Sequence, residues 1–322
     1  MELDAPETTW TYPDAALDEE LAAKRTRRTL PAGLIAQLKA EQAARAERAR
    51  KDHRAIQNAQ RDADHSFKRP VLMIEGDAVQ EPESEVWRHR LAARQAEIKA
   101  SLPSIGRIDL KNHDHMPWAG TGWYVADDIL VTNRHVALTL ALGGPPYPLR
   151  LNGAGSPIAG ALDTGHEHRR PEPRAAEILR ALWIAPDDNV APDVAFLQVA
   201  PGSGAPRLLL RDKPAQVGEW IAAVGYPGRD GARNDEDEMD AMFAGIYSVK
   251  RLSPGAVIGA TTDRFFHDCT TLGGNSGSAI FDLASGEVLG LHFGGAYKRR
   301  NFAVHAFQVR ELLEEHVTRG AQ

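Results

Sequence analysis

The 322-residue sequence contains one cysteine, Cys269, which excludes an internal disulfide and a zinc site built from several cysteines. It has no run of about 18 apolar residues, so no membrane-spanning helix is expected. The acidic start, Met1–Asp4, is not followed by an apolar segment, so we expect no secretory signal peptide. The formal net charge of −6 argues against nucleic acid as a partner. The sequence therefore predicts a cytoplasmic globular protein that binds neither nucleic acid nor membranes.

The N-terminal third of the sequence has a helical composition. Residues from about Leu30 to Arg61 are rich in Ala, Gln, Glu and Arg and predict a helix with a narrow apolar face. A short strand over Pro70–Glu75, a turn at Gly76-Asp77 and a second helix from about Ser84 to Leu102 are predicted next. The apolar positions of that second helix are Trp87, Leu91, Ile98 and Leu102. Because four residues cannot form a core alone, we expect this helix to pack on the following domain. Residues 1–102 are thus predicted to be a leader and helical extension.

The composition changes after Pro103, where short apolar runs alternate with clusters of Gly, Pro, Asn and Asp. This spacing, with no helices between the runs, is typical of an antiparallel sandwich or barrel. The predicted strands are Gly122–Ala126, Ile129–Thr132, Val194–Val199, Trp220–Val224, Ala256–Ile258, Ser278–Phe281, Val288–His292 and Phe302–Ala306. A final helix is predicted from about Gln308 to Thr318, and the acidic run Asp235–Glu238 is predicted to be a surface loop.

Three short segments stand in the order His, Asp, Ser. His135 follows the strand over Ile129–Thr132, Asp193 opens an apolar strand, and Ser276 lies in a Gly-rich turn. Acyl transfer needs a hydroxyl nucleophile, an imidazole that takes its proton and a carboxylate that orients the imidazole. Glycines let backbone N–H groups converge where negative charge develops on the carbonyl oxygen. Each residue alone is commonly structural, but the three together in a β-rich sequence favour a catalytic triad.

These segments resemble the trypsin-like, chymotrypsin-fold serine peptidases. The matching pieces are Gly120–Trp123, Thr132–Ala137, Asp193–Ala195 and Gly274–Gly277. The resemblance covers about residues 104–313 and implies a mainly β protein of two antiparallel six-stranded barrels. Barrel one would span about 103–200 and barrel two about 207–306, followed by a C-terminal helix over about 308–318. The protease domain is therefore predicted to be residues 103–322.

By the same resemblance, Ser276 is the nucleophile, His135 the general acid–base, and Asp193 the carboxylate that orients the imidazole. The backbone N–H groups of Gly274 and Ser276 would form the oxyanion hole. The implied activity is hydrolysis of a protein or peptide substrate through an acyl-enzyme, with no metal and no other cofactor. One departure is Asn275, which stands where animal trypsins have an Asp that pairs with the amine freed by zymogen cleavage. We therefore expect that this activation route is not used.

The closer resemblance is to bacterial members, in particular the glutamyl endopeptidases. The pieces that carry it are Thr271–Ser278 and Gly290–Gly295. The residues that would line the specificity pocket are Thr271, His292, Phe293 and Gly294. No Asp lies within residues 269–273 to bind a basic side chain, whereas Thr271 and His292 can donate hydrogen bonds to a carboxylate. A protonated His292 would also add charge. We expect a preference for Glu on the acyl side of the scissile bond; the alternative is a pocket for small apolar residues.

Other functions fit the sequence less well. A catalytically silent binding module with a protease fold usually lacks a triad residue or an oxyanion glycine, and this sequence has all of them; it stays the alternative. A quality-control protease of the HtrA type is less favoured. Such proteases carry a PDZ domain after the catalytic domain, and only about ten residues follow Leu313. The order His–Asp–Ser excludes an α/β-hydrolase esterase. Four histidines lie in predicted loops without the spacing of a metal site: His113, His115, His166 and His168. With a helical extension and no disulfides, limited cleavage of one specific partner is expected.

Overall fold

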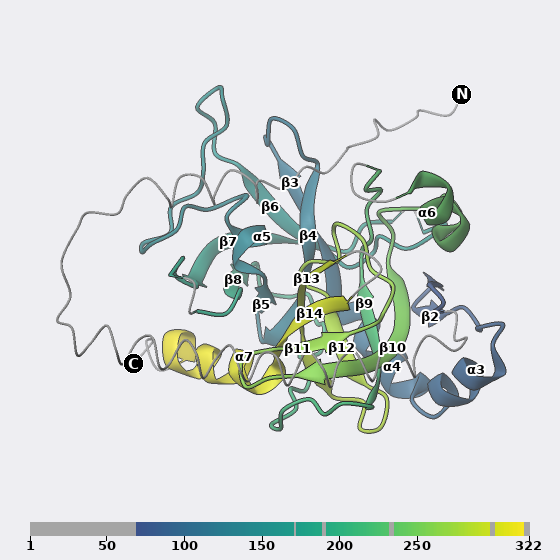
Figure 1. Cartoon of the computed structure of the whole chain (residues 1–322). Coiled ribbons are helices and arrows are strands. Elements are labelled where there is room, and N and C mark those ends of the chain that lie inside the picture. Colours follow the sequence, from purple (N-terminus) through teal and green to yellow (C-terminus); the bar gives the residue numbers. More distant parts are fainter. Residues whose placement is uncertain (1–68, 171, 189–190, 232–234, 297–299, 319–322) are drawn as a thin grey trace, which may run out of the picture. The chain divides into compact units, whose positions relative to one another are not determined.

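The computed structural model describes residues 69–170, 172–188, 191–231, 235–296 and 300–318. They form two antiparallel barrels, preceded by a hairpin and two helices and followed by a C-terminal helix (Figure 1). The predicted fold class is therefore confirmed. The helix predicted over Leu30–Arg61 lies outside the described residues. No helix in the described part of the chain is long and apolar enough to cross a membrane.

Barrel one is a closed ring of six antiparallel strands. In ring order they are β3 (Ile105–Lys111), β4 (Trp118–Ala126), β5 (Ile129–Thr132), β8 (Ala195–Val199), β7 (Ala175–Ile184) and β6 (Ala159–Asp163). Inward-facing side chains such as Ile108, Leu130 and Leu197 fill its interior and are fully buried. The short helix α5 (Arg134–Ala137) follows β5 and carries His135 at one end of the barrel.

Barrel two closes in the same way, because its first and last pairings link six strands into a ring. In ring order they are β9 (Trp220–Gly225), β10 (Arg251–Ala260), β11 (Phe265–His267), β14 (Arg300–His305), β13 (Val288–Ala296) and β12 (Ala279–Asp282). Ile221, Phe265 and Leu289 are fully buried in its core. The C-terminal helix α7 (Ala306–Leu313) follows β14 and continues as a π-helical turn over Glu314–Thr318.

The described part of the N-terminal extension is built onto barrel two. Strand β1 (Leu72–Glu75) pairs with β10, and β2 (Ala78–Val79) pairs back on β1 across the predicted turn. The helix predicted from Ser84 to Leu102 is two helices, α3 (Glu85–Ala92) and α4 (Gln95–Ser101), because Arg94 leaves the helical region with φ −128° and ψ 17°. Trp87 of α3 is fully buried, with its ring edge-on to that of Trp220 at 5.5 Å. The predicted packing of this helix on the following domain is confirmed.

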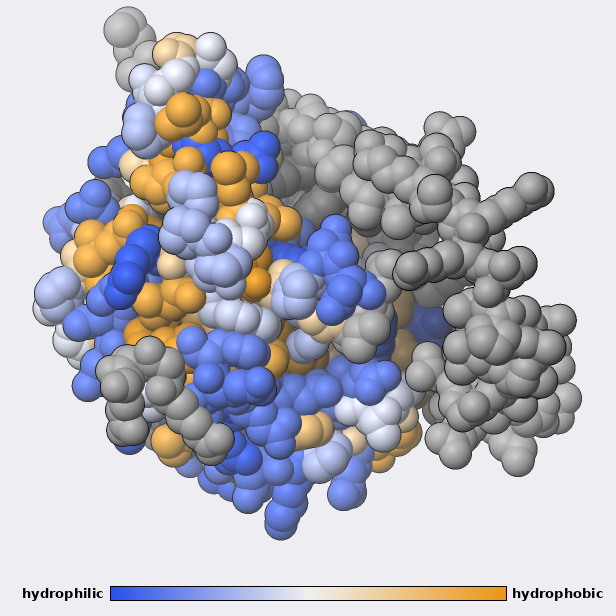
Figure 2. Space-filling model, turned by 90° about the vertical axis from the view of Figure 1, so that its left-hand side faces the viewer, coloured by the Kyte–Doolittle hydropathy of each residue, from blue (hydrophilic) through white to orange (hydrophobic). Residues whose placement is uncertain are grey.

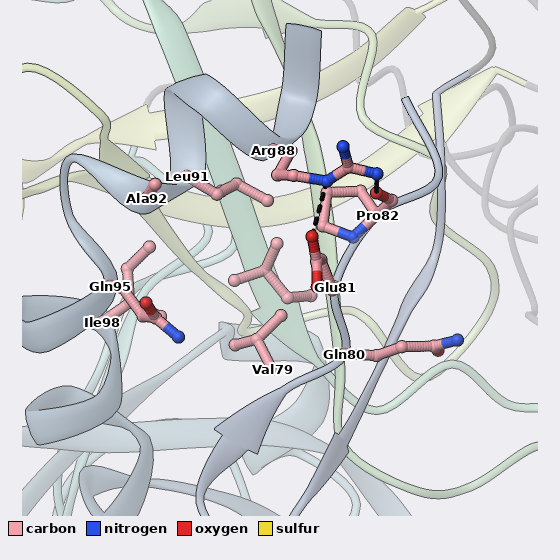
Figure 3. A pocket seen from close by; sticks show the side chains of 10 residues that line it. Val79, Gln80, Glu81, Pro82, Arg88, Leu91, Ala92, Gln95 and Ile98 are labelled. Carbon is pink, nitrogen blue, oxygen red and sulfur yellow. Dashed lines mark hydrogen bonds and ion pairs between the residues drawn. The ribbon is translucent and has the colours of Figure 1, made fainter. Parts of the chain in front are cut away.

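A pocket of about 310 Å³ lies between the hairpin and the two helices (Figure 3). Its apolar lining comes from Val79 on β2 and from Leu91 and Ile98 on the helices. At its rim the Arg88 guanidinium is paired with the Glu81 carboxylate at 2.6 Å. Apolar residues of both helices thus face the hairpin across the pocket, and the ion pair of Arg88 with Glu81 links α3 to the segment after β2.

The acidic run predicted as a loop is the start of helix α6 (Glu236–Phe243). The Asp235 carboxylate accepts a hydrogen bond of 3.0 Å from the Glu238 backbone N–H and so caps the helix. Acidic side chains in the first turn also interact favourably with the positive end of the helix dipole. Met239 and Phe243 are fully buried on the inner face. The loop prediction is wrong because the capping pattern and the apolar spacing outweigh the charge of the run.

The left-hand side of the molecule in Figure 1 presents apolar side chains gathered among polar ones (Figure 2). The large apolar residues exposed in the sequence span of barrel one are Leu142, Leu151 and Leu179. Exposed leucines are common on protein surfaces and do not by themselves indicate a partner.

Candidate active site

Ser276 lies in a tight turn between β11 and β12 whose shape requires two glycines. Gly274 and Gly277 adopt φ angles of +87° and +90°, a region that other residues rarely occupy. A Cβ atom at Gly277 would collide with the Thr121 carbonyl, and one at Gly274 would collide with the Trp118 ring. The two glycines therefore let the turn approach barrel one closely, and Ser276 itself is only 6% exposed.

Strand β4 of barrel one holds this turn in place. The Thr121 N–H donates to the Ser276 carbonyl at 2.8 Å, and the Thr121 hydroxyl donates to the Gly274 carbonyl at 3.0 Å. A Cβ atom at Gly120 would meet both the Ser276 carbonyl and the Val136 side chain at 2.9 Å. Val136 belongs to α5, the helix that carries the predicted base. The bare backbone of Gly120 thus lets α5 and the turn approach each other across β4.

His135 and Asp193 are 58 residues apart in the sequence and in direct contact in the fold. The His135 Nδ1 lies 2.6 Å from Asp193 Oδ2, and the His135 backbone N–H donates to Asp193 Oδ1 at 3.1 Å. Burial raises the pKa of Asp193, but the neighbouring His135 and its two hydrogen bonds outweigh burial and lower that pKa below its ordinary value. The ionised carboxylate therefore holds a proton on Nδ1 and leaves Nε2 able to accept one.

The side chain of Asn275 bonds within the turn itself. Its Nδ2 donates to the Leu272 carbonyl at 3.3 Å, and its Oδ1 accepts from the Ser278 hydroxyl at 3.2 Å. Asn275 is 5% exposed. These local bonds occupy the side chain that stands at the position of the ion-pairing Asp of animal trypsins.

Thr271, a predicted pocket residue, is bound to a residue that the sequence analysis missed. Its hydroxyl donates to Asn301 Oδ1 at 2.9 Å, and Asn301 Nδ2 donates to the Cys269 carbonyl at 2.6 Å. Asn301 lies on β14, directly opposite Gly295 of β13. No local sequence signal marks Asn301, because its role depends on the register of two strands that meet only in the folded barrel.

His292 lies beside the Ser276 turn on β13 and is almost completely buried. Its backbone N–H donates to the Ser278 carbonyl at 3.0 Å, and its carbonyl accepts from the Gly277 N–H at 2.8 Å. Burial, reinforced by the charge of His135, lowers the pKa of His292 to about 3. His292 is therefore neutral near pH 7.

Phe293 and Gly294, the other two predicted pocket residues, follow His292 along β13. The pairing of β13 with β14 shifts register at Phe293, whose ring stacks on Phe302 at 5.9 Å. A Cβ atom at Gly294 would meet no atom within 4 Å. Gly294 therefore faces open space.

A separate group of potential metal ligands lies on barrel one. His166 Nε2 is 3.3 Å from an Asp109 oxygen and 3.5 Å from an Asp163 oxygen. The Arg107 guanidinium lies 2.6 Å from His166 Nε2 and donates to Asp109 at 2.6 Å. Because Arg107 already pairs with Asp109, and Asp163 Oδ1 accepts from the Gly165 and Arg174 backbone N–H groups, the group is better suited to an ion-pair network than to a metal ion.

Residues 120–291 match the trypsin-like peptidase domain, and this span covers more than half of the chain. It includes the Gly120 strand, His135, Asp193 and Ser276. The chain belongs to the trypsin-like peptidase family.

Several bacterial proteases are similar to this trypsin-like peptidase. The glutamyl endopeptidase of Staphylococcus epidermidis is 25% identical over 196 residues, which cover 58% of each chain. That of Staphylococcus aureus strain MRSA252 is 29% identical over 113 residues, 35% of this chain and 27% of the relative. Among solved structures, the serine endoprotease from Yersinia pestis is 17% identical, with a TM-score of 0.47 over 70% of this chain and 66% of its own. The chain therefore spans just over half the length of the first of these relatives.

Proposed function

We propose that this protein is a serine endopeptidase that cleaves peptide bonds through an acyl-enzyme on Ser276. The observation that carries the proposal is the 2.6 Å contact between Asp193 and His135, because His135 lies on α5, the helix that approaches the Ser276 turn. In the first step the Ser276 Oγ attacks the carbonyl carbon while His135 Nε2 takes its proton. The imidazolium, stabilised by Asp193, then gives that proton to the leaving amine. Water hydrolyses the ester by the same route, and Ser276 regains its proton.

The tetrahedral intermediates need donors for their negative oxygen. We assign the backbone N–H groups of Gly274 and Ser276 to this role. Two other backbone bonds support the assignment: the Gly228 N–H donates to the Gly273 carbonyl at 2.6 Å, and the Ser278 N–H donates to the Asn275 carbonyl at 2.9 Å. These two carbonyls belong to the peptide groups that carry the Gly274 and Ser276 N–H groups, so the bonds fix the orientation of both donors. One such donor contributes about 10²–10³-fold to kcat in enzymes of this type.

A fluorophosphonate probe tests the nucleophile directly. Ser276 Oγ should attack phosphorus and expel fluoride, leaving one phosphonyl group on the peptide that contains Ser276 in a digest analysed by mass spectrometry. The His135→Ala variant should be labelled slowly, because its Ser276 has no base. A protein unfolded before treatment serves as the control and should not be labelled. A folded wild type that resists the probe would support the silent binding module instead.

We further propose that the pocket selects Glu through His292 as a neutral donor. His267 Nε2 lies 3.1 Å from His292 Nδ1, and His267 Nδ1 is buried with no hydrogen-bond partner among the described residues. A buried N–H without an acceptor is rarer than a buried lone pair without a donor. His267 therefore carries its proton on Nε2 and donates it to His292. The proton of His292 then sits on its own Nε2, where it can be donated to a substrate carboxylate.

Peptides that differ only in the residue on the acyl side test this pocket. We expect kcat/KM for Glu to exceed that for Leu by at least about 100-fold, because an apolar side chain leaves the polar groups of the pocket without partners. The His292→Ala variant should lose most of this ratio. Equal kcat/KM for Glu and Leu, or an unchanged ratio in the variant, would refute the assignment.

The same peptides give a pH test of the neutral state of His292. Since its pKa is lowered to about 3, its state does not change between pH 5.5 and pH 8. The ratio of kcat/KM for Glu over Gln should therefore stay constant across this range. If the ratio instead fell by about tenfold for each unit of rising pH, a proton would be taken up together with the Glu side chain.

A further inference from the structure

The segment over 268–274 connects β11 to the Ser276 turn without belonging to either sheet. Its conformation therefore depends on bonds from other parts of the chain. On one side, Asn301 binds the Cys269 carbonyl and the Thr271 hydroxyl. Asp268, Thr270 and Leu272 contact other partners than Asn301. These contacts define two sides of the segment: we call the side at Asn301 the pocket side and the other side the back.

Arg69, at the start of the described extension, binds two residues on the back of this segment. Its guanidinium donates from Nε and from the second terminal nitrogen to Asp268 Oδ2, at 3.0 and 2.5 Å. Its backbone carbonyl accepts from the Thr270 hydroxyl at 3.1 Å. One residue of the extension therefore fixes both Asp268 and Thr270, which lie about 200 residues further along the sequence.

The Arg69 side chain is itself held rigidly. Its guanidinium carbon lies 5.3 Å from the centre of the Trp87 ring and 5.8 Å from that of Trp220. The side chain is 14% exposed, and that of Asp268 is 21% exposed, so solvent screens this ion pair only in part. Asp268 Oδ1 also accepts from the Ala256 N–H of β10 at 2.7 Å. The pair thus links the extension to the frame of barrel two.

Leu272 completes the back of the segment. It packs with Met239 and Phe243 of α6 in a small apolar cluster, and Val71 of the extension packs against the same cluster. Leu272 precedes Gly273 and the oxyanion glycine Gly274 by only one and two residues. Asp268, Thr270 and Leu272 therefore all rest on the extension or on a cluster that the extension contacts.

We propose that Arg69 is a positioning residue for the specificity pocket. It holds the back of the segment over 268–274, and Thr271 lies on the pocket side of the same segment. This inference rests on the proposed function, because it assigns Thr271 and Asn301 to the substrate pocket. It also gives the extension a role: residues 69–71 support the pocket rather than restrain it. Without Arg69, the segment keeps its bonds to Asn301 but loses its back support at Asp268.

The protein carries its own probe for this inference. Cys269 is the second residue of the segment, is 1% exposed and is the only cysteine in the sequence. In the Arg69→Met variant of the full chain, the segment should open more often, and a thiol reagent should modify Cys269 about tenfold faster than in wild type. Arg69→Lys, which keeps the charge but not the paired donors, should give an intermediate rate.

The matched control is Arg94→Met, which removes another arginine of the same extension. Arg94 pairs with Glu97 at 3.1 Å and also binds the Ala284 carbonyl, away from the segment, so Cys269 should react at the wild-type rate. If Arg69→Met does not fold, Thr270→Val, which removes only the bond to the Arg69 carbonyl, replaces it and should give a smaller acceleration. The proposal would be overturned if a thiol reagent modified Cys269 at the same rate in Arg69→Met, or in the Thr270→Val variant that replaces it, as in the Arg94→Met control.

The kinetics separate this inference from the proposed function. The ratio of kcat/KM between Glu and Leu peptides does not depend on how much of the enzyme is folded. Arg69→Met should lower that ratio, whereas a general loss of stability would lower both values equally. A wild type that fails to cleave any peptide would refute the proposed protease while the Cys269 rates still decide whether Arg69 holds the segment. A normal Glu-to-Leu ratio in Arg69→Met, in a protein that cleaves peptides, would overturn the inference alone.

Discussion

Ser276→Ala should lower kcat for peptide hydrolysis by about 10⁴- to 10⁶-fold, because the proposed acyl-enzyme forms on the Ser276 hydroxyl. Backbone bonds hold the turn around Ser276, and they do not involve its hydroxyl: the Thr121 N–H binds the Ser276 carbonyl, and the Gly277 N–H binds the His292 carbonyl. The variant should therefore fold and bind substrate with little change. Initial rates with a fluorogenic Glu peptide, together with thermal unfolding, measure both properties.

Ser278→Ala provides a control in the same turn. Its hydroxyl donates only to Asn275 Oδ1 among the described bonds, at 3.2 Å, and is buried. Losing it should cost about 1 kcal/mol of stability and leave the nucleophile in place. If Ser276→Ala cleaves the peptide as fast as Ser278→Ala, the assignment of Ser276 is incorrect.

The sequence predicted those parts of the site that short motifs encode. His135 and Asp193 each adjoin an apolar strand, and both strands were recognised, so the 2.6 Å contact between their side chains follows from adjacent strands. The Ser276 turn is predicted from its Gly-rich sequence, and the structure shows that Gly274 and Gly277 adopt positive φ angles there. Glycine positions and the spacing of apolar strands can be recognised in the sequence, and they are sufficient to predict these positions.

Other elements of barrel one were missed because their composition is not typical of strands. β7 has the sequence Ala-Ala-Glu-Ile-Leu-Arg-Ala-Leu-Trp-Ile, and β6 contains two Ala and one Gly, residues with low intrinsic strand preference. They form strands because the barrel pairs β6 with β3 and β7 with β8. Tertiary pairing thus overrides local propensity at both.

The partners of the pocket could not be predicted for a different reason. Asn301 is 30 residues from Thr271, and Arg69 is 199 residues from Asp268, with no pattern that links either pair. Their contacts depend on strand register and on how the extension packs. The same limit applies to His292, whose pKa is lowered by burial and by the nearby His135 rather than by its neighbours in the sequence.

Asp193→Asn should lower kcat by about 10⁴-fold although it changes a single atom. In wild type the carboxylate accepts from His135 Nδ1 at 2.6 Å, which leaves Nε2 free of a proton and able to take the one from Ser276. In the variant the amide can place its NH₂ group toward Nδ1. The imidazole then carries its proton on Nε2, where it cannot act as the base.

The fold should tolerate this substitution, because most contacts of Asp193 survive it. The amide oxygen can still accept from the His135 backbone N–H, and Asn133 Nδ2 still donates to the backbone carbonyl of residue 193. The melting temperature should therefore change little, whereas both kcat and the rate of fluorophosphonate labelling should fall together.

The acid dependence of stability should also change. In wild type the pKa of Asp193 is lowered in the native state, so its ionised form stabilises the native state above the carboxyl pKa of the unfolded chain. This stabilisation is lost as the pH falls through the lower native pKa. Asp193→Asn removes that dependence, so its unfolding should respond less to acid than that of wild type. An Asp193→Asn variant that keeps wild-type kcat at pH 7 would show that His135 has the correct tautomer without the carboxylate, and the triad assignment would fail.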